Sequence, residues 1–160
     1  MNVKAQVGET FTITTSSIPG RSGDTCYLEL IFTITSISDN LIGCKLVVYA
    51  NKTGTVGTIY YRNFTIRDNG GNIYSGSFVV PRTTTRQQVG SGGSYFTFGP
   101  NSLTISYDAG GSSPYTSYTD SGYVGLYKSL RFNNSQVINL YFNGTQVKSV
   151  YLNGTKIDSY

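Results

Sequence analysis

The sequence contains no histidine and no tryptophan, and only 12% of its 160 residues are charged. Without histidine, Ser-His-Asp and Cys-His nucleophiles, histidine general bases and most catalytic zinc sites are excluded. The net charge of +4 reflects few acids rather than many bases. A nucleic-acid-binding surface usually carries a denser basic stripe. We therefore expect no nucleic-acid partner and interpret the local basic cluster as a solvated sheet face: Arg62, Arg67, Arg82 and Arg86.

A pair of carboxylates, as glycosidases use, is the remaining route to catalysis. Asp39, Asp68 and Asp108 lie in turn-like contexts, where aspartate is expected to cap the backbone. Residues 68–72 (DNGGN) lack the spaced acids of a strong calcium loop and favour a hairpin turn. We expect a non-enzymatic protein with no catalytic residues, metal or cofactor, and an acid-pair glycosidase is the lower-ranked alternative.

The two cysteines, Cys26 and Cys44, flank a stretch that predicts a β-hairpin turning at residues 39–40. In that hairpin the numbers of paired residues sum to about 79, so Cys26 faces about residue 53. Cys44 then lies about 25 Å away along the ladder, whereas a disulfide requires Cα atoms within about 7 Å. The pattern predicts two buried free thiols.

Long hydrophobic runs are also lacking. The N-terminal residues show neither the basic start nor the apolar core of a secretory signal. The apolar runs are too short to span a bilayer. We expect no membrane insertion, and no export by a signal encoded in this sequence.

Glycine, tyrosine, serine, threonine and asparagine are abundant, as is typical of β-structure with many tight turns. Leu28, Leu30, Phe32 and Ile34 alternate with polar residues and therefore share one face of a strand. Similar alternation predicts about eight strands and no helix. We expect an all-β, immunoglobulin-like or jelly-roll-like β-sandwich over residues 1–129, with strands at 7–15, 27–37, 45–49, 58–67, 73–80, 94–98, 103–107 and 122–132.

Residues 130–160 contain three ten-residue units: LRFNNSQVIN, LYFNGTQVKS and VYLNGTKIDS. Asn-Gly is favoured in two-residue hairpin turns, so the units predict a C-terminal β-hairpin meander. Short hairpins are marginal alone in water. They therefore need either their own sandwich or neighbouring chains, and we expect an assembly or docking segment that depends on Tyr141, Asn143, Gly144, Tyr151, Asn153 and Gly154.

Residues 112–127 (SSPYTSYTDSGYVGLY) mix tyrosine with serine, threonine and glycine, a composition typical of adaptable recognition loops. Tyr115, Tyr118 and Tyr123 are candidates to stack on sugar rings or to contact another protein. In the alternative interpretation, Tyr123 and Tyr127 are strand residues that face the core and the loop is only a connection.

The units of the form VYLNGTKI resemble segments at the ends of structural proteins of bacteriophages and prophages. The stretches TFTITTSS, SGSFVVPR and LTISYDAGGSS are similar in composition to immunoglobulin-like modules of phage fibres. The resemblance implies a virion structural protein of the tail, a fibre or the capsid surface, acting in particle assembly. It implies a homo-oligomer that contacts other virion proteins and, in host attachment, cell-surface glycans. No long heptad or collagen-like shaft is present, which favours a small accessory, decoration or tip component. A carbohydrate-binding module that uses the tyrosine-rich loop is the alternative.

Overall fold

The computed structural model describes residues 1–19, 25–38, 40–54, 57–68, 71–82 and 85–128, together with the backbone of six short strands between residues 130 and 159. The described part is all-β, as predicted, and none of its segments is a helix that could cross a membrane. The strands of the body are β1 (Asn2–Lys4), β2 (Thr10–Thr14), β3 (Ile18–Pro19), β4 (Thr25–Ile37), β5 (Leu41–Lys52), β6 (Ile59–Asp68), β7 (Gly71–Val80), β8 (Arg86–Thr97), β9 (Gly99–Gly110) and β10 (Thr116–Tyr127).

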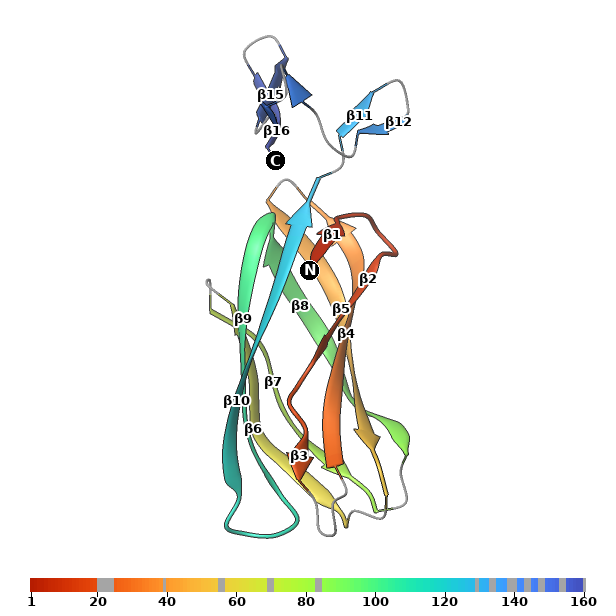
Figure 1. Ribbon diagram of the computed structural model, residues 1–160, viewed down its shortest axis with the longest axis vertical. Helices are drawn as coiled ribbons and strands as arrows, with labels where there is room; N and C mark the ends of the chain where they lie inside the picture. Colours follow the sequence, from red (N-terminus) through yellow and green to blue (C-terminus); the bar gives the residue numbers. More distant parts are fainter. Residues whose placement is uncertain are drawn as a thin grey trace.

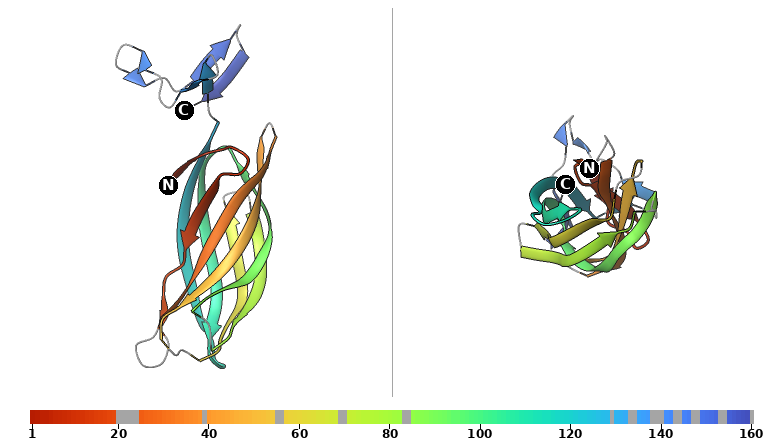
Figure 2. Two further views of the ribbon diagram at one scale, coloured as in Figure 1. Left: turned by 90° about the vertical axis from the view of Figure 1, so that its right-hand side faces the viewer. Right: turned by 90° about the horizontal axis from the view of Figure 1, so that it is seen from below.

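These strands form two sheets that pack face to face as a β-sandwich (Figures 1 and 2). Sheet A has the order β1-β10-β9-β6-β7, and sheet B has the order β2-β4-β5-β8, with β3 paired to β4. The pairing is antiparallel except between β1 and β10, where Asn2 lies opposite Gly125 in a parallel ladder. The first strand therefore lies beside the last strand of the body.

The core lies between the sheets and follows from the period of two in each strand. On β4, Leu28, Leu30 and Phe32 have no exposed surface, as their alternation predicts. Their neighbours in sheet B include Phe96, whose ring is 5.2 Å from that of Phe32. Sheet A contributes an aromatic layer around Tyr107. The centre of its ring lies 5.4 Å from that of Tyr61 and 5.9 Å from that of Phe64.

Both cysteines are free and buried, which confirms the prediction from the hairpin. Cys26 pairs with Lys52, and Cys44 pairs with Ile34. The residue numbers of paired positions sum to 79 near the turn and to 78 further from it, because the register shifts between Ile34 and Ser36. Burial raises the pKa of the Cys44 thiol to about 12 and also raises that of Cys26.

The predicted strands are present, but several are longer than their hydrophobic alternation indicates, and two were missed. β1 and β3 were not predicted, because three and two residues are too few to show a period. The predicted strand at 122–132 was placed wrongly. β10 begins at Thr116, where it pairs with Ala109 of β9, and it ends at Tyr127.

The C-terminal repeats each contain one antiparallel pair of strands. The pairs are β11 (Leu130–Phe132) with β12 (Ser135–Val137), β13 (Tyr141–Phe142) with β14 (Thr145–Gln146), and β15 (Ser149–Leu152) with β16 (Thr155–Ser159). In the described backbone they form three separate two-stranded sheets rather than one continuous meander. The predicted turn residues Asn143, Gly144, Asn153 and Gly154 lie outside the described residues.

Candidate recognition site

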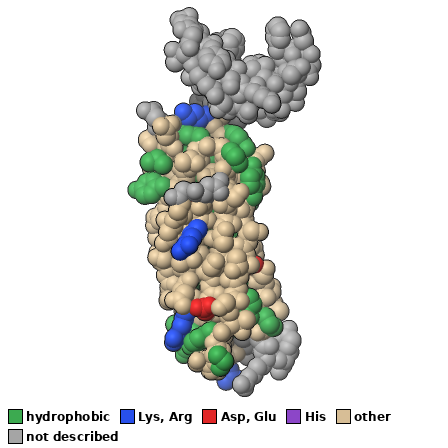
Figure 3. Space-filling view, turned by 90° about the vertical axis from the view of Figure 1, so that its left-hand side faces the viewer, with side chains coloured by type: hydrophobic (Ala, Val, Ile, Leu, Met, Phe, Trp, Pro, Cys, Tyr) green, Lys and Arg blue, Asp and Glu red, His purple; other side chains and the backbone are tan. Residues whose placement is uncertain are grey.

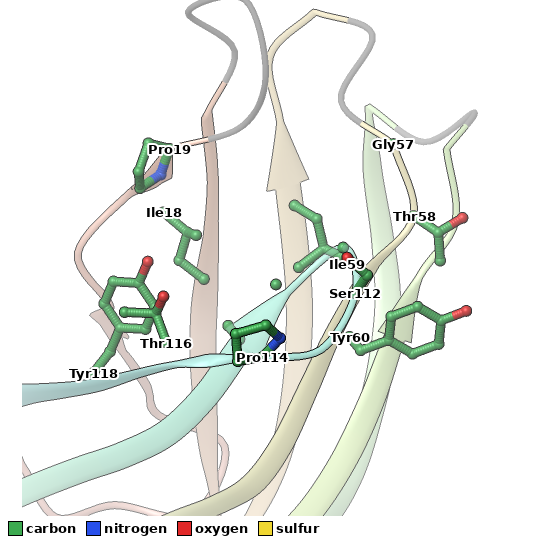
Figure 4. A pocket seen from close by; sticks show the side chains of 13 residues that line it. Ile18, Pro19, Gly57, Thr58, Ile59, Tyr60, Ser112, Pro114, Thr116 and Tyr118 are labelled. Atoms are coloured by element: carbon green, nitrogen blue, oxygen red, sulfur yellow. The ribbon is translucent and has the colours of Figure 1, made fainter.

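A cleft of about 680 Å³ opens at the end of the sandwich where β3 ends and β6 and β10 begin (Figure 4). Ile18 and Pro19 of β3 border one side, and Tyr60 of β6 lies on the other. The connection between β9 and β10 contributes Pro114, which lies between these walls in the close-up view. Three segments far apart in the sequence therefore build the cleft.

The described lining is uncharged. It combines apolar faces with hydroxyl groups, among them Thr58, Ser112 and Thr116. Gly110 and Gly111 leave the backbone of the connection uncovered, so its peptide groups also border the space. Apolar walls with a few polar groups are typical of small-molecule sites.

Tyr118 lines the cleft from β10 and is supported from beneath by an aromatic stack. Its ring lies 5.4 Å from that of Tyr107 at an interplanar angle of 18°, and Tyr107 stacks in turn on Phe64. The hydroxyl of Tyr107 donates to Oδ2 of Asp120 at 2.9 Å. Burial raises the pKa of Tyr107, so this hydroxyl remains a donor at neutral pH. The ring of Tyr118 is thereby held in one position.

Tyr115 fixes the connection to β6 instead of lining the cleft. Its ring meets that of Tyr60 edge to face at 6.5 Å. The guanidinium carbon of Arg62 lies 4.6 Å from the centre of the Tyr115 ring, within the range of a cation–π contact. The cleft wall at Tyr60 and the connection are therefore joined by one aromatic and one charged contact.

Next to these rings, side-chain hydrogen bonds join β6, β9 and β10. Asp108 of β9 accepts hydrogen bonds from Nδ2 of Asn63 at 2.7 Å and from Oγ of Ser117 at 2.6 Å. These bonds lower the pKa of Asp108, Ser117 contributing most. Asn63 has a φ of 51° and lies at the register shift of the β6–β7 ladder between Tyr61 and Phe64. This left-handed conformation, which asparagine tolerates better than most residues, aims the amide at Asp108.

Of the three predicted recognition tyrosines, only Tyr118 lines the cleft. Tyr123 lies on β10 five residues beyond Tyr118, about 17 Å further along the strand and on its other face. Tyr123 is 44% exposed, which contradicts the alternative interpretation that its side chain faces the core. The sequence spacing predicts this difference once the segment is recognised as a strand, because residues 118 and 123 are an odd number apart and therefore lie on opposite faces.

The described residues bring no acid pair into the cleft, since neither aspartate nor glutamate lines it. Asp108 and Asp120 project from opposite faces of sheet A, and Glu29 of sheet B forms an ion pair with Arg86 at 3.0 Å. In the same part of the chain no cluster of histidine, cysteine, aspartate or glutamate could hold a metal ion. Figure 3 shows one face of the molecule, on which charged side chains are few and scattered.

Composition alone did not single out the residues that hold the site together. Tyr60, Arg62 and Asn63 belong to a predicted strand (TIYYRNFTIR), and nothing in that pattern shows that they meet the β9–β10 connection. The chain matches no protein-family model, no curated protein and no solved structure.

Proposed function

We propose that this chain is a non-enzymatic structural protein of a bacteriophage particle, and that its sandwich attaches to carbohydrate through the cleft at its free end. The observation that carries the proposal is a preformed cleft whose described lining is uncharged and includes Tyr118 and Tyr60. Neutral sugars are recognised by hydroxyl and peptide groups together with flat apolar faces, and both kinds of group border this space.

Preorganisation supports binding rather than a merely structural connection. The contact of Tyr115 with Arg62 holds the β9–β10 connection against β6, and Asp108 at the end of β9 accepts a hydrogen bond from Asn63 of β6. A ligand that enters the cleft therefore need not order this connection first, which lowers the entropic cost of binding. The described part of the lining is neutral, which suits an uncharged glycan better than a phosphate or a nucleic acid.

The position of the cleft supports an attachment role. β10 begins beside the cleft at Thr116 and ends at Tyr127, after which the chain continues to β11 (Figure 1). Its length is about 36 Å. The recognition site and the C-terminal repeats thus lie at opposite ends of the body, so repeats held in a particle would leave the cleft accessible.

Glycan binding can be tested with bacterial surface polysaccharides on an array, followed by calorimetry on any that bind. We expect the full chain to bind at least one of them, and Tyr118→Ala to lose that binding because its ring forms part of the wall. Tyr123→Ala is the matched control, since it removes an exposed tyrosine from the other face of the same strand. Absence of binding to every polysaccharide, or equal binding by both variants, would contradict the proposal.

A carbohydrate-binding module outside any virion is the alternative, and it uses the same cleft. The two functions differ in what the repeats do. A particle component needs them for assembly, whereas a free-standing module binds its glycan equally well without them.

A further inference from the structure

One lateral side of the sandwich presents two long strand edges. β7 ends sheet A and pairs only with β6 within the described residues, and β8 likewise ends sheet B beside β5. The two edges lie on the same side, because Phe78 of β7 packs against Gly90 of β8 and Tyr74 packs against Gly92. The strands contain ten and twelve residues.

On the opposite side the outermost strands are short, and the stretch of β10 that β1 leaves unpaired, residues 116–124, contains a charged residue, Asp120. β1 has three residues and β2 has five. Short edge strands, charged side chains and proline are the usual means by which proteins prevent sheets from joining edge to edge. β7 (GNIYSGSFVV) contains neither a charged residue nor a proline. The register of β7 with β6 shifts twice, at a bulge at Ile73 and at Ser77, which lies opposite the extra residue of β6.

The outer side chains of this segment leave the edge accessible. Ser75, Ser77 and Val79 point away from the core and are exposed, Val79 by 53%. They are small, so a neighbouring strand can approach to the usual spacing of about 4.8 Å. The backbone groups along the free edge of β7 can then form a ladder with that strand.

We propose that β7 pairs antiparallel with β7 of a second copy of this chain, so that the A sheets of the two copies join into one continuous sheet. Residues 74–80 are self-complementary about Ser77. A two-fold axis there places Ser77 opposite itself and Ser75 opposite Val79, with no like charges in contact. β8 is less suited to this role, because it contains two adjacent glycines, Gly92 and Gly93, which weaken a strand.

The two-fold axis gives a direct test by charge. Ser77→Lys places two ammonium groups opposite each other, and Ser77→Glu places two carboxylates there. Sedimentation of the full chain over a range of concentrations should show a dimer for the wild type and a dissociation constant raised by about tenfold or more in either variant. An equimolar mixture of the two variants should dimerise again, because opposite charges then meet at the axis.

Ser102→Lys, on the exposed face of β9 in the interior of the same sheet, is the matched control and should leave the dimer unchanged. Circular dichroism verifies that each variant is folded. A wild-type monomer at every concentration would overturn the proposal. So would a dimer that Ser77→Lys leaves intact, one that Ser102→Lys also dissociates, or one that the mixed variants fail to restore. Glycan binding is measured in a separate experiment, so its absence leaves this result unaffected.

Discussion

At the scale of single residues, two adjacent glycines of β8 show how closely the sheets approach. A Cβ atom on Gly92 would lie 2.6 Å from Cε2 of Tyr74, whose ring stacks on that of Phe78 at 6.3 Å. A Cβ atom on Gly93 would have no heavy atom within 4 Å. The same residue type is thus required for packing at one position and not at the next.

We therefore predict that Gly92→Ala lowers the free energy of unfolding by about 1–3 kcal/mol, the usual cost of overpacking a core. Gly93→Ala should change it by less than about 0.5 kcal/mol, as for other surface substitutions. Urea denaturation of the two variants measures the difference. Equal stabilities would mean that Tyr74 moves aside without cost.

At the scale of elements, the β9–β10 connection depends on the hydrogen bonds to Asp108. Because its pKa is lower in the folded chain than in the unfolded chain, Asp108 stabilises the fold at a pH above its unfolded value of about 3.9. That contribution is lost as the pH falls through the lowered native pKa.

We predict that the free energy of unfolding falls less in Asp108→Asn than in the wild type when the pH is lowered from 5 to about 2. At neutral pH the variant should be less stable than the wild type. Melting temperatures recorded across this range test the prediction. Ser117→Ala, which removes the largest contribution to the lowered pKa, should shift the profile in the same direction. Parallel profiles for the variants and the wild type would show that Asp108 has no such role.

Most elements of the body could be predicted from the sequence because their signals are local. Leu28, Leu30 and Phe32 alternate with polar residues, and the register from Cys26 to Lys52 follows from the position of one turn. The cleft could not be predicted, because Pro19, Tyr60 and Pro114 belong to different segments, and their meeting depends on the order of strands in the sheets. The parallel pairing of β1 with β10 has no local signal either.

At the scale of the whole molecule, the sandwich and the repeats have separable roles. Within the described residues, the two strands of each repeat pair only with each other, so neither sheet of the body includes them. We predict that a chain shortened to end at Leu130 keeps the melting temperature of the body but forms smaller assemblies with itself or with virion proteins. Light scattering during size-exclusion chromatography tests this, and identical masses for both chains would contradict an assembly role for residues 130–160.

The hairpin of β4 and β5 has a consequence for the surroundings in which the protein can work. It keeps Cys26 and Cys44 far apart along the ladder and buries both. The sandwich is closed by its aromatic core, without a covalent link between its thiols. Its stability therefore does not depend on a disulfide bond, and the same fold can form among reducing thiols.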